Sequence, residues 1–152
     1  MKNEHLKMKG VYTFTLENIE TGEKRVIVKE NLIPTAGRAF IASRLAQVGT
    51  PQDIKVTHTA LGTGTTAPAN GDTQLQTETY RKAVASATSS GAVAYFTAFY
   101  TATEVTGTFK EAGVFINGTG TANSGTLFSR VAVDITKTNL ETLTIDYSVA
   151  LQ

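Results

Sequence analysis

Alternation of apolar and polar side chains is the feature that most constrains the fold of this chain. It is strictest at the end of the predicted strand 140–151, where from Thr142 onward every second side chain is apolar and those between are mostly small and polar. The apolar members are Leu143, Ile145, Tyr147, Val149 and Leu151. Because successive side chains of a β-strand point to opposite faces, this period of two predicts a strand with one face in a core.

The composition agrees with a mainly β fold. Threonine accounts for 26 of the 152 residues, and it suits strand surfaces because its branched side chain is stiff at the first torsion. A chain of this length fits one domain. The absence of cysteine excludes disulfides, thiolate zinc sites and cysteine nucleophiles. A net charge of +1 argues against a strong electrostatic hold on nucleic acid.

Period-two segments separated by turn residues predict about eight strands. They span residues 11–16, 25–29, 54–61, 77–88, 92–103, 107–116, 126–135 and 140–151. This series of strands is typical of an antiparallel β-sandwich, and we expect a jelly-roll-like arrangement.

One short helix is predicted near residues 35–47. Pro34 suits the first turn of a helix, and Gly49 and Pro51 follow its end. Helical spacing places Phe40, Ile41 and Leu45 on the face that we expect to be buried.

Charge is concentrated in the first part of the chain. Residues 1–30 hold 11 charged side chains, whereas the other 122 residues hold 16. We therefore divide the chain into an N-terminal arm, 1–10, and a single sandwich domain, 11–152. The hypothesis for the arm is that it pairs with a neighbouring chain or lies on a host lattice. It lacks the apolar stretch of a signal peptide, and no segment is as long and apolar as a membrane span, so we expect synthesis in the cytoplasm and no membrane partner.

No constellation of residues for catalysis, metal binding or cofactor binding stands out. His5 and His58 are far apart and lack metal-ligand spacing. The segment 62–66, Gly-Thr-Gly-Thr-Thr, is not followed by the lysine of a phosphate-binding loop. The serines lack the nucleophile-elbow signature, and the carboxylates are scattered singly. We expect a protein that is not an enzyme and has no cofactor or metal.

Two charged residues lie inside otherwise apolar strands. Glu111 lies between Phe109 and Val114, and Arg130 lies between Phe128 and Val131. Because buried charges need partners, the hypothesis is a structural Glu111–Arg130 ion pair.

Aromatic residues cluster on the predicted strand 92–103. Phe96 and Tyr100 share one face, and Tyr95 and Phe99 share the other. Such a strand is either central and covered on both sides or part of a subunit contact. An alternative is that Tyr95 and Tyr100 stack against a host-surface glycan, as exposed aromatic rings do in sugar-binding modules.

Several short segments resemble a family of small virion structural proteins of tailed bacteriophages, often described as tail-fibre or appendage proteins. They occur in the expected order over nearly the whole chain. The matching segments are Asn31-Leu32-Ile33 with Gly37; Ala60-Leu61-Gly62-Thr63-Gly64 with Thr66; Glu78-Thr79-Tyr80-Arg81-Lys82; Lys110-Glu111-Ala112-Gly113-Val114-Phe115; Leu127-Phe128-Ser129-Arg130; and Lys137-Thr138 with Leu143-Thr144-Ile145.

The resemblance implies a non-enzymatic β-sandwich protein located in a virion. It leaves a tail appendage, a baseplate-associated protein and a capsid decoration protein as alternatives. The implied partners are further copies of the chain and other virion proteins. Strand edges with few guarding charges after residue 30 favour a homo-oligomer independently. The alternative function is a carbohydrate-binding or host-receptor-binding module.

Overall fold

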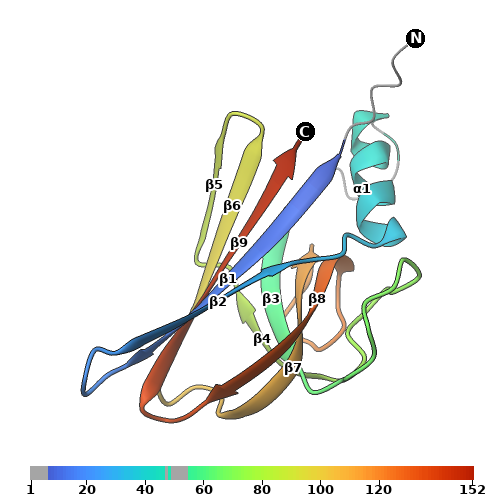
Figure 1. Cartoon of the computed structure of the whole chain (residues 1–152). Helices are drawn as coiled ribbons and strands as arrows, with labels where there is room; N and C mark the ends of the chain where they lie inside the picture. Colours follow the sequence, from blue (N-terminus) through green and yellow to red (C-terminus); the bar gives the residue numbers. More distant parts are fainter. Residues whose placement is uncertain (1–6, 47, 49–54) are drawn as a thin grey trace.

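Two antiparallel β-sheets pack face to face in the structure, a computed structural model that describes residues 7–46, 48 and 55–152 (Figure 1). Sheet A has the order β2-β1-β9-β6-β5, and sheet B has the order β4-β3-β7-β8. The strands of sheet A are β1 (Met8–Asn18), β2 (Lys24–Glu30), β5 (Ser86–Ser90), β6 (Val93–Tyr100) and β9 (Glu141–Leu151). Those of sheet B are β3 (Val56–Gly62), β4 (Glu78–Ala83), β7 (Gly107–Ile116) and β8 (Thr126–Lys137).

The predicted β-sandwich is confirmed. Its topology consists of hairpins that each remain within one sheet, namely β1–β2, β3–β4, β5–β6 and β7–β8, with β9 between β1 and β6. A jelly roll is instead assembled from two Greek keys, so the structure supports the β-sandwich and not the finer jelly-roll-like arrangement.

The core lies between the two sheets, where the alternating apolar side chains meet. In β9, Leu143, Ile145, Tyr147 and Val149 are buried as predicted, whereas Leu151 at the end of the strand is exposed. Tyr12 and Phe14 of β1 and Val114 of β7 belong to the same core cluster.

Residues 77–88, predicted as one strand, form β4 in sheet B and β5 in sheet A. The chain changes sheets at Val84 and Ala85. The Val84 N–H donates to the Thr57 carbonyl next to β4, and the Ala85 N–H donates to the Thr97 carbonyl of β6. The backbone hydrogen bonds therefore pass from one sheet to the other between adjacent residues, which a period-two pattern does not reveal.

The predicted boundary of the N-terminal arm at residue 10 is wrong. Met8 to Gly10 belong to β1 and pair with the end of β9. Lys7 extends this pairing, because its backbone and that of Gln152 exchange two hydrogen bonds. Residues 1–6 lie outside the described residues, so the hypothesis for the arm stays a prediction for them.

The helix α1 spans Thr35–Leu45 and packs on β8 at one end of the sandwich (Figure 1). Gly37 lies against the backbone of Phe128, where a Cβ atom would come within 2.6 Å of the carbonyl oxygen. Phe40 and Ile41 pack on the core as predicted. Leu45 is instead 82% exposed, so its predicted burial is wrong; it lies in the last turn, at the end of α1 farthest from sheet B. No described helix is long and apolar enough to cross a bilayer.

Candidate functional site

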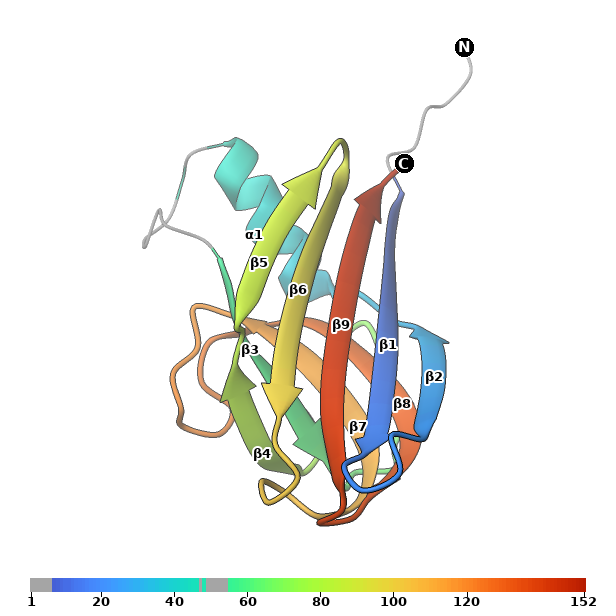
Figure 2. The same cartoon turned by 90° about the vertical axis from the view of Figure 1, so that its left-hand side faces the viewer.

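The outer face of sheet A is uncovered in the described part of the chain. Figure 2 looks onto this sheet, and neither α1 nor a loop crosses its middle. We call the central outward side chains of four of its five strands, β2, β1, β9 and β6, the open face. Its residues are Val11, Thr13, Thr15, Val26, Val28, Tyr95, Thr97, Phe99, Thr142, Thr144, Asp146 and Ser148.

Strand register fixes how these side chains lie across the sheet. One row runs from Val28 through Thr13 and Asp146 to Thr97. The next row runs from Val26 through Thr15 and Thr144 to Phe99. Apolar side chains thus lie toward both sides of the open face and hydroxyl groups lie between them. Val26 and Val28 are 58% and 60% exposed, which is unusual for such apolar residues in the middle of a strand.

Charge is confined largely to the ends of the open face. Asp146 is its one charged member, and the Thr97 hydroxyl donates to the Asp146 carboxylate at 2.6 Å. The outermost rows of the face also carry charge, in the ion pairs Lys9–Glu30, at 2.8 Å, and Lys24–Glu17, at 3.6 Å. Glu30 is the register partner of Val11, and Glu17 is that of Thr142. An apolar and neutral centre with a charged rim is the arrangement found at protein–protein interfaces.

A shallow hollow of about 320 Å³ lies within the open face. Tyr95, Asp146 and Ser148 are among the residues that line it, together with Val11 and Thr13. The hollow therefore offers an aromatic ring, a carboxylate and hydroxyl groups to a bound molecule.

The two tyrosines predicted as a glycan platform lie in opposite environments. Tyr95 is 45% exposed on the open face. Tyr100 is fully buried between the sheets, and its hydroxyl hydrogen bonds to that of Thr59 at 3.0 Å. Burial raises the pKa of Tyr100 far above that of a free tyrosine. The prediction that Tyr100 stacks on a glycan is therefore wrong: Tyr95 and Tyr100 are an odd number of positions apart on β6 and point to opposite sides.

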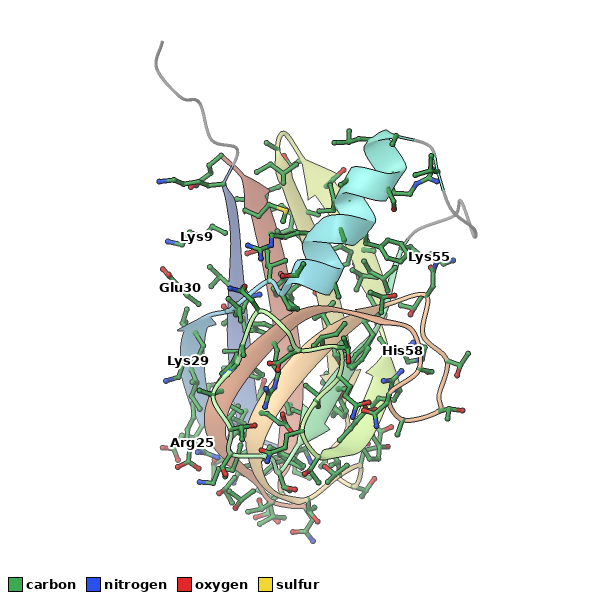
Figure 3. All side chains as sticks on the ribbon, turned by 90° about the vertical axis from the view of Figure 1, so that its right-hand side faces the viewer. Lys9, Arg25, Lys29, Glu30, Lys55 and His58 are labelled. Carbon is green, nitrogen blue, oxygen red and sulfur yellow. The ribbon has the colours of Figure 1, made fainter. Side chains whose placement is uncertain are left out.

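The outer face of sheet B, in contrast, is covered by the chain itself (Figure 3). The connection between β3 and β4 folds over this face and places Leu75 in a small cluster with Ala60, Phe115 and Leu127. The same connection is fixed by the carboxylate of Glu111. That carboxylate accepts hydrogen bonds from the backbone N–H groups of Gly64 at 3.1 Å, Gln76 at 3.0 Å and Thr77 at 2.7 Å.

The predicted Glu111–Arg130 ion pair is present and structural. The Arg130 Nη2 atom lies 2.8 Å from Glu111 Oε2, and both side chains are at most 3% exposed. Arg130 also binds the Asp72 carboxylate at 2.7 Å and donates to the Thr66 carbonyl at 3.0 Å. Glu111 and Arg130 thus attach the β3–β4 connection to sheet B.

The glycine-rich segment 62–66 has a packing role. A Cβ atom on Gly62 would lie 2.6 Å from Glu111 Oε1, and one on Gly64 would lie 2.5 Å from the same atom. Glycine at both positions lets the backbone approach the carboxylate.

A second buried ion pair, Glu78–Arg81, was not foreseen from the sequence and holds the β7–β8 connection on sheet B. We call this pair and the Glu111–Arg130 pair the two clamps of sheet B. The buried side chains of Arg81 and Glu78 make two hydrogen bonds, of 2.6 and 2.9 Å. Arg81 also donates to the Ser124 carbonyl at 2.9 Å, and the Asn123 N–H donates to Glu78. The Arg81 guanidinium lies 4.3 Å from the centroid of the Phe115 ring. The available signal was the group of charged residues Glu78, Arg81 and Lys82 in a part of the chain where charge is otherwise rare.

His58 lies on β3 close to this clamp. Burial, with the nearby Arg81 charge as a smaller contribution, lowers its pKa below the usual 6.5. Across residues 7–46, 48 and 55–152, no three histidine or acidic side chains come together as a metal site would require.

Searches with family models, against curated proteins and against solved structures find no match to this chain. Several segments that carry the resemblance, around Gly62, Glu78, Arg81, Glu111 and Arg130, meet at the two clamps of sheet B.

Proposed function

We propose that this protein is a non-enzymatic structural subunit of a tailed-bacteriophage virion, docked on a larger assembly through the open face of sheet A. The observation that carries the proposal is the contrast between the two outer faces. Sheet B is closed by its own loops through buried clamps, whereas sheet A leaves a neutral, partly apolar surface bare.

The chemistry of the open face favours another protein surface as its occupant. Its centre is rich in valine, threonine and aromatic side chains, and charge is low there. Exposed apolar patches with a polar rim mark interaction sites in soluble proteins. The low charge also gives no electrostatic basis for binding nucleic acid.

Electron microscopy of particles tests the proposed role. Virions carrying a gold-labelled copy of the chain are expected to show label at one kind of position, on the tail, the baseplate or the capsid, and that position separates the three alternatives. Unlabelled particles, with the protein absent from their composition by mass spectrometry, would contradict the proposal.

A carbohydrate- or receptor-binding module is the second candidate, and the hollow beside Tyr95 favours it. The ring, the Asp146 carboxylate and neighbouring hydroxyl groups match what a sugar requires for stacking and hydrogen bonding. On a glycan array, Tyr95→Ala is expected to abolish binding under this reading. Phe99→Ala is the matched control, because Phe99 has similar exposure on the same strand but does not line the hollow. Equal signals from the wild type and Tyr95→Ala would reject this candidate.

A further inference from the structure

β5 is an exposed sheet edge that carries no charge. All five of its residues, Ser86 to Ser90, are exposed, and among the described strands its only partner in sheet A is β6. Figure 2 shows β5 as the outermost strand of sheet A, with no described strand beside its free edge; α1 lies behind the sheet there, and its Ile41 lines a common hollow with Ser89. An unprotected edge strand offers unpaired backbone N–H and C=O groups to another strand.

The other edge strands are protected. β2 carries Lys24, Arg25, Lys29 and Glu30, and Figure 3 shows three of these at the rim of the sheet. The edge of β8 is partly occupied by Leu32, whose backbone exchanges two hydrogen bonds with that of Arg130, at 3.1 and 3.0 Å. β4 contains Glu78, Arg81 and Lys82, and the β7–β8 connection binds to two of them. Charges and covering segments are the usual protection of sheet edges.

We propose that β5 pairs with β5 of a second copy of this chain, in antiparallel orientation about a two-fold axis at Thr88. The sequence of the strand suits this pairing because it is nearly symmetric. Thr88 would face Thr88 of the second copy, Ser86 would face Ser90, and Ala87 would face Ser89. Hydroxyl pairs of this kind are favourable across strands, and two-fold self-pairing closes without further copies.

The pairing would join the two open faces into one continuous surface. Thr88 lies beside Tyr95 in the register of β5 and β6. With three strand spacings between them, the two Tyr95 residues would lie about 14 Å apart. A dimer would therefore present two hollows side by side on a ten-stranded sheet. This inference concerns the free protein and does not depend on the proposed function.

Disulfide formation tests the register directly, since the chain has no cysteine of its own. In the proposed dimer the Cα atoms of the two Thr88 residues lie about 4.5–5.5 Å apart, which is within disulfide range. We expect Thr88→Cys to give a covalent dimer on mild oxidation. Ser86→Cys should not, because the two Ser86 residues would lie about 14 Å apart. The double variant Ser86→Cys with Ser90→Cys should cross-link again.

Equal cross-linking of Thr88→Cys and Ser86→Cys, or none from Thr88→Cys, would overturn the proposal. Mass measurement by sedimentation provides a second readout without cysteine. Thr88→Lys places like charges opposite each other and should raise the Kd of the dimer about fivefold or more. Ala122→Lys, in an exposed loop, adds the same charge away from β5 and should leave the Kd unchanged. A wild type that remains monomeric at high concentration would also contradict the inference.

Discussion

Glu111 of β7 and Arg130 of β8 form a buried ion pair, 2.8 Å long, beneath the connection between β3 and β4. Each charge has further partners, so the carboxylate and the guanidinium both stay hydrogen bonded away from water. The pair fixes a loop over sheet B, whereas no described segment crosses the middle of the outer face of sheet A.

Glu111→Gln should destabilise the protein strongly. The substitution keeps the size of the side chain but leaves Arg130 with the less buried Asp72 as its remaining carboxylate partner, so we expect a loss of about 1.5–3 kcal/mol in free energy of unfolding. Urea unfolding measures this cost. The control is Lys110→Met, which removes the exposed Lys110–Asp134 pair and should cost no more than about 1 kcal/mol. Similar losses from the two variants would contradict a structural role for Glu111.

Two glycines of one loop should respond differently to alanine. Gly64→Ala would place a Cβ atom 2.5 Å from Glu111 Oε1, and we expect a loss of about 1–3 kcal/mol. Gly71→Ala meets no atom within 4 Å and should change stability by no more than about 0.5 kcal/mol. Thermal unfolding of the two variants compares them directly. Equal midpoints would show that the approach of Gly64 to Glu111 does not constrain the loop.

Stability should fall as the pH drops below about 6.5, the usual pKa of histidine. Burial lowers the pKa of His58 in the folded state, so the unfolded chain takes up the proton first and acid favours unfolding. In His58→Gln this part of the loss of stability should disappear. A plot of the free energy of unfolding against pH should therefore be flatter between pH 7 and 5.5 than that of the wild type. Parallel curves for the two proteins would show that His58 does not contribute.

The sequence was informative wherever a local pattern decides the structure. The period of two predicted the buried residues of β9, and the rarity of charge after residue 30 made Glu111 and Arg130 conspicuous in apolar strands. It did not predict the partners that depend on tertiary placement. Asp72 reaches Arg130 from a distant loop, and the change of sheet at Val84 leaves the alternation almost undisturbed.

The aromatic residues of β6 show the same division. The alternation correctly placed Tyr95 and Tyr100 on opposite faces of the strand. Which face is covered depends on the packing of sheet A on sheet B, and this information is not contained in the strand itself. For the same reason Leu45 had helical spacing for burial but lies in a turn of α1 with little of the protein beside it.

Binding of purified Val28→Lys to particles that lack the protein tests the central claim most directly. Val28 is 60% exposed on the open face, and a lysine there places a charge at the proposed contact without disturbing the core. Its occupancy on particles, measured by quantitative gold labelling, should fall at least tenfold relative to wild type, while Ala122→Lys in the loop over sheet B should bind normally. Normal occupancy of Val28→Lys, with Ala122→Lys impaired instead, would show that the protein docks through the other face.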